Sequence, residues 1–321
     1  MVLNPILAPE EIEREKGVII EEIAMYEDTP LLKVGDVFEQ LIFKGNPLGW
    51  DITGTPESVK KIKRNDFLSY RKLHYHSEDI ILSISGGINE KEVLKLVKAY
   101  FGNLASFKGR SFKGSEEFKY KAKKPQVKIK FKKNEQAHLI LGFLGNPRGY
   151  RSRFAEAVLS VILGGGMSSR LFIEVRERRG LAYSVKNSID RYSDTGYIAT
   201  YAGVDLKKVE EAIKVILDQH YGLSEKRYPV LPRELKKAKE YLKGHLALAL
   251  EDTKDVNGFF AEQALFLEKI LTPEEIFKKI DNVSIEEVVS EAKKLFLQEK
   301  LNLAIIGPYK DANRFERLLK A

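Results

Sequence analysis

The stretch PEEIEREKGVIIEEIAM, residues 9–25, reappears in diverged form 223 residues later as PRELKKAKEYLKGHLAL, residues 232–248. Proline, glutamate, lysine and aliphatic residues recur at matching positions. Three more matches follow in the same order: EQLIF (39–43) with EQALF (262–266), TPESVKKI (55–62) with TPEEIFKKI (272–280), and FLSYRKLHYHSEDIILSISG (67–86) with VVSEAKKLFLQEKLNLAIIG (288–307). Four collinear matches predict an internal repeat of about 220 residues.

Each copy is typical of a long helix, a second helix, a short helix, an apolar strand that ends at glycine, and a last amphipathic helix. The second copy alone has a further segment upstream, about 110 residues long by this reading. It contains the strand-like runs VKIKF, HLILGFLG, LAYSVKNSI and GYIATYAG, a helix over 151–163, and a helix that ends at Arg179. We therefore expect the first half to be incomplete, with an equivalent block missing before Met1.

This order of elements predicts an α+β fold with two homologous halves, in which mainly antiparallel sheets carry helices on one face. The predicted boundaries are an incomplete N-terminal domain over 1–106, a linker over 107–125 and a homologous C-terminal domain over 126–321.

Composition narrows the possible chemistry. The 321 residues include no cysteine, so disulfides, thiolate zinc sites and cysteine nucleophiles are excluded, and any metal must use His, Asp or Glu. The 54 basic residues are interleaved with 46 acidic ones, and the basic tract over 105–133 is interpreted as linker, so no nucleic acid partner is expected. Without a long apolar run or the features of a signal peptide, we expect no membrane partner and a cytoplasmic location.

The helix predicted over residues 9–28 has two carboxylates in an unusual place. At about 100° per residue, Glu15 and Glu22 fall within the apolar arc of the helix, which is formed by Ile12, Ile19, Ile23 and Tyr26. A buried carboxylate is costly unless it is paired or binds a metal, so both are candidate functional residues. A place at the rim, or a salt bridge to an arginine, is the alternative. The second copy has Ala238 and His245 at these positions.

Together with PLGWDITGTPESV (47–59) and LGGGMSSRLFIEVRERRGLAYSV (163–185), this helix resembles the pitrilysin/insulinase family of zinc metallopeptidases, and in particular its processing-peptidase-like branch. In this family an H-x-x-E-H helix supplies two zinc ligands and the general base, and a later glutamate is the third ligand. The resemblance implies that Glu22 is this zinc ligand and that Glu15 is the acidic residue supporting the site. It also implies that Arg176 and Tyr183 reach the substrate and stabilise the transition state.

The chain departs from the family at one decisive point, because H-x-x-E-H occurs nowhere in it. Its histidines are His74, His76, His138, His220 and His245. His74 and His76 are spaced for a metal pair, but their match to Leu295 and Leu297 favours residues at the end of an element. One of three expected zinc ligands remains, so we expect no hydrolysis by this chain alone.

These observations predict a zinc metalloendopeptidase of peptides or unfolded polypeptides, present here as a fragment. The alternative is a non-catalytic subunit of a heteromeric peptidase that binds peptides or serves as a partner. For either function, the expected assembly is a homodimer or a heteromer with a related subunit. A third possibility is that a separate chain supplies H-x-x-E-H and docks here.

Overall fold

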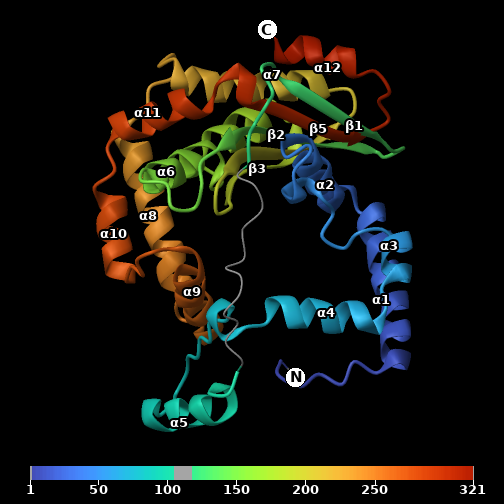
Figure 1. The fold of residues 1–321 in the computed structure, drawn as a ribbon. Coiled ribbons are helices and arrows are strands. Elements are labelled where there is room, and N and C mark those ends of the chain that lie inside the picture. Colours follow the sequence, from blue (N-terminus) through green and yellow to red (C-terminus); the bar gives the residue numbers. More distant parts are fainter. Residues whose placement is uncertain (1, 105–117, 321) are drawn as a thin grey trace. The chain divides into compact units, whose positions relative to one another are not determined.

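The computed structural model describes residues 2–104 and 118–320, and the chain divides into two compact units (Figure 1). Unit 1 comprises Met1–Asp28, Asp51–Glu116 and Ala249–Ile270. Unit 2 comprises Thr29–Trp50, Glu117–Leu248 and Leu271–Ala321. Most of the predicted linker lies outside the described residues, and its remainder, from residue 118 onward, belongs to unit 2.

Unit 2 contains one five-stranded sheet and its helices. The strands are β1 (Gln126–Phe131), β2 (Gln136–Gly145), β3 (Ala182–Arg191), β4 (Gly196–Asp205) and β5 (Leu301–Gly307). The helical elements are α2 (Pro30–Ile42), η1 (Pro47–Gly49), α6 (Arg153–Gly164), the π-helix η3 (Phe172–Glu177), α7 (Val209–Ser224), α8 (Pro232–Ala249), α10 (Pro273–Asp281), α11 (Ile285–Leu295), η4 (Gln298–Lys300) and α12 (Ala312–Leu319).

The strand order is β1-β5-β2-β4-β3, and every pair is antiparallel except β1 with β5. Strand β5 is therefore paired on both edges: Ala304 lies opposite Lys128 of β1 and Ile140 of β2. All seven residues of β5 are buried, as expected for an apolar central strand covered on both faces. The α+β class with a mainly antiparallel sheet is confirmed.

Helices cover both faces of this sheet. On one face, Leu303 and Ile305 pack in a core that includes residues of α6, α7, α11 and α12. On the other face, Ala304 and Ile306 pack against Val34, Val37, Phe38 and Ile42 of α2. Figure 1 shows α2 beneath the sheet and α7, α11 and α12 above it. The sequence prediction placed helices on one face only, because a helical pattern does not say which sheet it will cover.

Unit 1 is helical in its described residues. Its elements are α1 (Pro9–Asp28), α3 (Pro56–Lys61), α4 (Arg64–His74), η2 (Ser77–Asp79), α5 (Glu90–Phe101) and α9 (Thr253–Phe266). Thr55 begins α3 with a capping box formed with Ser58, as the sequence TPES favours. The predicted strand ILSISG, residues 81–86, does not form a regular strand. This prediction is wrong for the described residues because no neighbouring strand in unit 1 pairs with that segment.

Each unit contains one helix from the other half of the sequence. Helix α2, from the first half of the sequence, belongs to unit 2, and α9, from the second half, belongs to unit 1. The predicted division of the sequence did not include this exchange. Within residues 2–104 and 118–320, the structure has no helix with the length and apolarity needed to cross a bilayer.

Candidate functional site

Arg176 and Tyr183 lie in contact in unit 2. The guanidinium carbon of Arg176 is 4.8 Å from the ring centroid of Phe172 and 5.0 Å from that of Tyr183. Both distances are within the range of cation–π attraction. The resemblance implied a shared substrate-contacting role for this arginine and this tyrosine, and the structure places their side chains in contact.

The local backbone explains the contact. Arg176 is on the π-helix η3, which is anchored by the buried side chains of Leu171 and Val175. Gly180 ends the helix with a φ of +55°, a conformation that costs glycine little, and Leu181 donates its N–H to the Val175 carbonyl at 2.8 Å. Strand β3 begins at the next residue. Single π-helical turns are frequent at functional sites.

Tyr183 lies in an irregularity of its own. In the β3–β4 ladder Ala182 pairs with Val204 and Ser184 with Gly203, so Tyr183 is an extra residue on β3. A β-bulge of this kind redirects a side chain away from the regular alternation. The Tyr183 side chain is 78% exposed although Ala182 is buried. Because β3 is the last strand in the sheet order, Tyr183 also lies on an edge strand.

The nearby carboxylate of Glu174 does not occupy the guanidinium of Arg176. Glu174, on the same π-helix, forms ion pairs with Arg178 and Arg179. Arg176 is exposed, and among the described residues no carboxylate forms a salt bridge with it. A guanidinium held by two aromatic rings and free of an acidic partner can donate hydrogen bonds to a carbonyl oxygen or an oxyanion.

The two predicted carboxylates lie on α1 in unit 1. Glu15 is exposed and Glu22 is half-buried, and Ile23 is the one buried residue of the helix. The expectation that both carboxylates point into a buried face is therefore wrong for Glu15 and only partly met by Glu22. The reason is that α1 packs on the rest of unit 1 with few of its apolar residues, while Val18 and Met25 remain more than half exposed.

Zinc does not fit the described residues as a complete site. Within residues 2–104 and 118–320, no three His, Asp or Glu side chains are grouped so that they could hold a metal ion. His74 stacks on Tyr70, with ring centroids 4.3 Å apart, and Nε2 of His76 lies 3.1 Å from the Leu73 carbonyl oxygen. In the part of the chain that the structure describes, no third His, Asp or Glu side chain is grouped with His74 and His76 as a metal ligand.

A polar cluster beside α2 was not predicted from the sequence. The hydroxyls of Tyr192 and Tyr197 both donate to Oε1 of Glu39, at 2.6 and 2.9 Å. Burial is the main cause that raises the pKa of Tyr197, and the negative charge of Glu39 raises it further. Burial also raises the pKa of Tyr192, as does its hydrogen bond to Glu39. Both phenols therefore stay protonated as donors. The signal available in the sequence was EQLIF, but its glutamate has no visible partner until the sheet forms.

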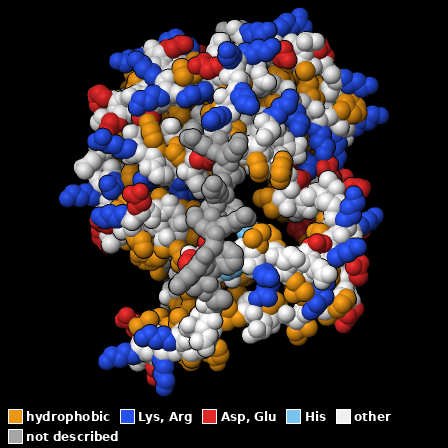
Figure 2. Space-filling model, in the orientation of Figure 1, with side chains coloured by type: hydrophobic (Ala, Val, Ile, Leu, Met, Phe, Trp, Pro, Cys, Tyr) orange, Lys and Arg blue, Asp and Glu red, His pale blue; other side chains and the backbone are white. Residues whose placement is uncertain are grey.

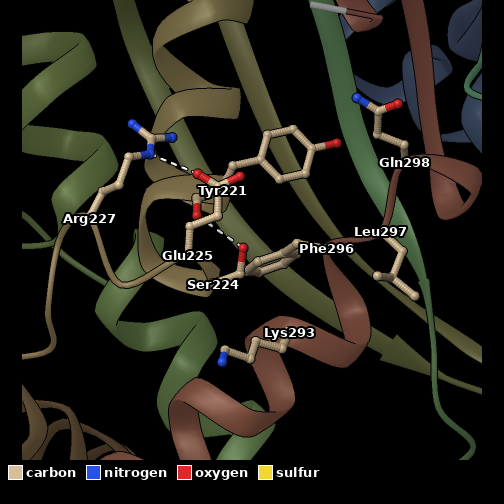
Figure 3. Close-up of a pocket in the computed structure, with 8 residues that line it drawn as sticks. All are labelled: Tyr221, Ser224, Glu225, Arg227, Lys293, Phe296, Leu297 and Gln298. Atoms are coloured by element: carbon tan, nitrogen blue, oxygen red, sulfur yellow. Dashed lines mark hydrogen bonds and ion pairs between the residues drawn. The ribbon is translucent and has the colours of Figure 1, made fainter.

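Unit 2 also has a surface pocket of about 530 Å³, whose eight lining residues include none of the predicted site residues (Figure 3). Arg227 donates to Glu225 and to Asp218, both at 2.7 Å, so its charge is balanced. Burial raises the pKa of Tyr221 to about 12, and its hydroxyl has no hydrogen-bond partner among the described residues. A neutral phenol and balanced charges do not identify a class of ligand.

Known proteins are similar to this chain in sequence. A family profile described as "Peptidase M16 inactive domain" matches residues 61–242. A Mycobacterium leprae protein named as an uncharacterized zinc protease is 31% identical over all of this chain, which covers 71% of that relative. A Bacillus subtilis protein of the same description is 34% identical over 93% of this chain and is also covered to 71%.

Solved structures show the same fold. A Helicobacter pylori protease aligns with a TM-score of 0.86 at 20% identity, over 94% of this chain and 73% of that one. A peptidase M16 inactive domain from Pseudomonas fluorescens aligns with a TM-score of 0.85 at 19% identity, over 96% of this chain and 73% of that one. At these identities the similarity is one of fold.

Proposed function

The chain belongs to the peptidase M16 family, as the resemblance to pitrilysin and insulinase implied, and we propose that it is the substrate-positioning part of a zinc metalloendopeptidase. In this proposal the chain binds peptides or unfolded polypeptides and does not hydrolyse them by itself. Hydrolysis requires a polypeptide that carries H-x-x-E-H. The observation that carries the proposal is the contact between Arg176 and Tyr183 on an edge strand.

The edge strand gives the substrate a way to bind. Among the described residues, β3 has a strand neighbour on one edge only, so its other edge can pair with an extended peptide. The guanidinium of Arg176 and the hydroxyl of Tyr183 lie at the start of this strand and would donate to a peptide carbonyl. Donors aimed at an oxygen that becomes negative stabilise the transition state more than the ground state.

Glu22 has a separate role in the proposal. It would be one zinc ligand, and the two remaining ligands and the general base would come from the H-x-x-E-H polypeptide. Glu15, two helical turns earlier on the same helix, would support that site by its charge. A zinc ion with three protein ligands keeps a position for water, whose pKa it lowers.

A non-catalytic partner subunit is the second candidate function. It is favoured by the match of residues 61–242 to the family profile described as "Peptidase M16 inactive domain". In that case the arginine–tyrosine pair would bind peptide without any role in hydrolysis. The two candidate functions differ in whether Glu22 acts as a zinc ligand.

Peptide binding by the chain itself tests the shared part of both candidates. Fluorescence anisotropy would follow fluorescein-labelled, carboxymethylated casein in EDTA, where zinc has no part. We expect saturable binding, weakened roughly ten-fold in Arg176→Ala, because a hydrogen bond to a charged group contributes about 1.5–3 kcal/mol. Leu248→Ala, at an exposed leucine of unit 2, is the matched control. Equal affinity of Arg176→Ala and the control would remove the arginine from the proposed peptide site.

A further inference from the structure

The exposed side chains of β3 form a charged row on the edge strand of the sheet. Burial alternates along this strand: Val185 and Asn187 are buried, whereas the residues on either side of them are exposed. We call four exposed residues the β3 row: Ser184, Lys186, Ser188 and Asp190. At about 3.3 Å per residue, roughly 13 Å separate Lys186 from Asp190. The row therefore carries a positive and a negative charge four residues apart.

Buried polar contacts fix the other side of β3. The side-chain oxygen of Asn187 accepts a hydrogen bond from Ser160 of α6 at 2.7 Å, and its amide nitrogen donates to Thr200 of β4 at 2.9 Å. All three residues are buried, so these bonds hold the strand between α6 and β4. Because successive side chains of a strand point to opposite faces, the β3 row is held on the other face of the sheet.

The end of the row at Asp190 is negative. Asp190 lies opposite Tyr197 of β4, and Tyr197 donates a hydrogen bond to Glu39 at 2.9 Å. Burial raises the pKa of Tyr197 most, and the negative charges of Glu39 and Asp190 raise it further. Among the described residues, no side chain forms a salt bridge with Asp190. A cationic side chain of a bound peptide can therefore pair with this carboxylate.

The end of the row at Lys186 is positive. Lys186 lies opposite Tyr201 of β4, whose hydroxyl is 2.9 Å from Nδ1 of His138. Burial lowers the pKa of His138, so this imidazole is neutral at pH 7 and adds no charge. Within residues 2–104 and 118–320, no carboxylate forms a salt bridge with Lys186. Its ammonium group is therefore available to a carboxylate of a bound peptide.

The net charge of the chain does not explain selectivity between peptides. With 54 basic and 46 acidic residues, the chain carries a net charge of +8. Figure 2 shows Lys and Arg side chains over much of the visible surface, so acidic peptides are attracted in general. Selectivity that arises from the β3 row must therefore be measured with peptides of equal net charge.

We propose that the β3 row selects extended peptides in which a basic residue stands four positions before an acidic residue. This inference rests on the proposed function, because it takes the edge of β3 as the peptide site. Antiparallel strand pairs are slightly more stable per residue than parallel ones, so the peptide runs from the Asp190 end towards Tyr183. Side chains directly opposite on neighbouring strands are about 5 Å apart. The basic side chain therefore lies beside Asp190 and the acidic side chain beside Lys186.

Two peptides of equal composition test this selectivity in EDTA, where zinc has no part. Both are fluorescein-labelled and consist of threonine and valine with one lysine and one glutamate. The lysine stands four positions before the glutamate in one peptide and four positions after it in the other. Fluorescence anisotropy with the full chain should show roughly five- to ten-fold tighter binding of the lysine-first peptide, because opposite-charge pairs replace like-charge pairs. High salt should reduce this difference, since exposed charges are screened.

A charge swap assigns the selectivity to the row. Lys186→Glu combined with Asp190→Lys keeps the net charge of the chain and should reverse the preference, so that the glutamate-first peptide binds more tightly. The control is Glu211→Lys combined with Lys214→Glu, at two exposed residues of α7. It also keeps the net charge, and it should keep the preference for the lysine-first peptide. Thermal melting verifies that both double variants are folded.

The outcomes separate this inference from the proposed function. Equal affinity for the two peptides, with both weakened in Arg176→Ala, would overturn the selectivity and leave the peptide site in place. Tighter binding of the glutamate-first peptide by the unmodified chain would also overturn the selectivity, and so would a preference that the charge swap leaves unchanged. Binding of neither peptide, or binding that Arg176→Ala does not weaken, would contradict the proposed function and this inference with it.

Discussion

The guanidinium of Arg176 lies 5.0 Å from the ring centroid of Tyr183, where a π-helix leads into a bulged edge strand. Two backbone irregularities thus converge on two exposed polar groups. Irregularities of this kind are retained at functional sites more often than in ordinary connections. Because neither side chain is buried, substitutions of Arg176 or Tyr183 can test function without unfolding the protein.

Tyr183→Phe keeps the ring beneath Arg176 and removes only the hydroxyl. If the hydroxyl stabilises the transition state, kcat of the assembled peptidase falls about 10²- to 10³-fold with little change in KM. The melting temperature does not change, because the side chain is 78% exposed. Steady-state kinetics beside thermal melting measure both. An increase in KM at constant kcat would instead assign Tyr183 to ground-state binding.

Glu39→Ala leaves the hydroxyls of Tyr192 and Tyr197 without their shared acceptor. We expect a loss of about 2–3 kcal/mol in the free energy of unfolding, since partly buried donors lose a charged partner. Glu240→Ala, whose carboxylate pairs with Lys243 on the surface of α8, should change stability by less than about 1 kcal/mol. Urea unfolding at pH 7 compares the two. Equal losses would mean that the cluster does not hold α2 on the sheet.

His220 makes unit 2 less stable in mild acid. Burial lowers its pKa from 6.5 to about 4, and Nδ1 lies 2.7 Å from the Ile216 carbonyl oxygen. The unfolded chain binds the proton more tightly, so this contribution to stability is complete above pH 6.5 and is lost as the pH falls towards 4. At pH 5 the loss is about 2 kcal/mol.

Urea unfolding between pH 7 and pH 5 isolates this contribution when wild type is compared with His220→Phe. The variant should lose less stability than wild type over this interval, whatever its stability at pH 7. His245→Phe, at an exposed position, is the control and should keep the wild-type slope. Identical slopes for His220→Phe and wild type would show that His220 titrates normally in the fold.

Glu22→Gln tests the metal role proposed for α1. In a mixture with an H-x-x-E-H polypeptide, the variant should bind zinc at least 10-fold more weakly, because a first-shell carboxylate is lost. Glu21→Gln, the exposed neighbour on the same helix, should leave zinc affinity unchanged. Competition with a fluorescent zinc chelator measures both affinities. Equal affinities would favour the non-catalytic partner subunit.

Much of unit 2 could be predicted because its strands and helices have clear apolar patterns. The runs VKIKF, HLILGFLG, LAYSVKNSI and GYIATYAG correspond to β1, β2, β3 and β4. The contact between Arg176 and Tyr183 could not be predicted from spacing alone, because it depends on a π-turn and a bulge that local patterns do not encode. Glu15 was placed wrongly for a related reason: a helical wheel shows which residues share a face but not whether anything packs on it.

The sequence also did not predict which unit helices α2 and α9 pack in. The predicted repeat matched EQLIF with EQALF, but it did not predict that α2 belongs to the unit formed mainly by the second half of the sequence, or that α9 belongs to the other unit. The segment ILSISG has the composition of a central strand, and central strands form only when neighbours are present on both edges.

Turnover upon mixing tests the central claim most directly. Two polypeptides would be assayed with zinc and a quenched-fluorescent casein: this chain, and the part of the Bacillus subtilis relative that lies outside its match to this chain. Each would be assayed alone, and then the two would be mixed. The account predicts no turnover by either polypeptide alone, and turnover by the mixture that is lost in Glu22→Gln but kept in Glu21→Gln. Turnover by this chain alone, or a mixture that binds together and is equally active with Glu22→Gln, would contradict it.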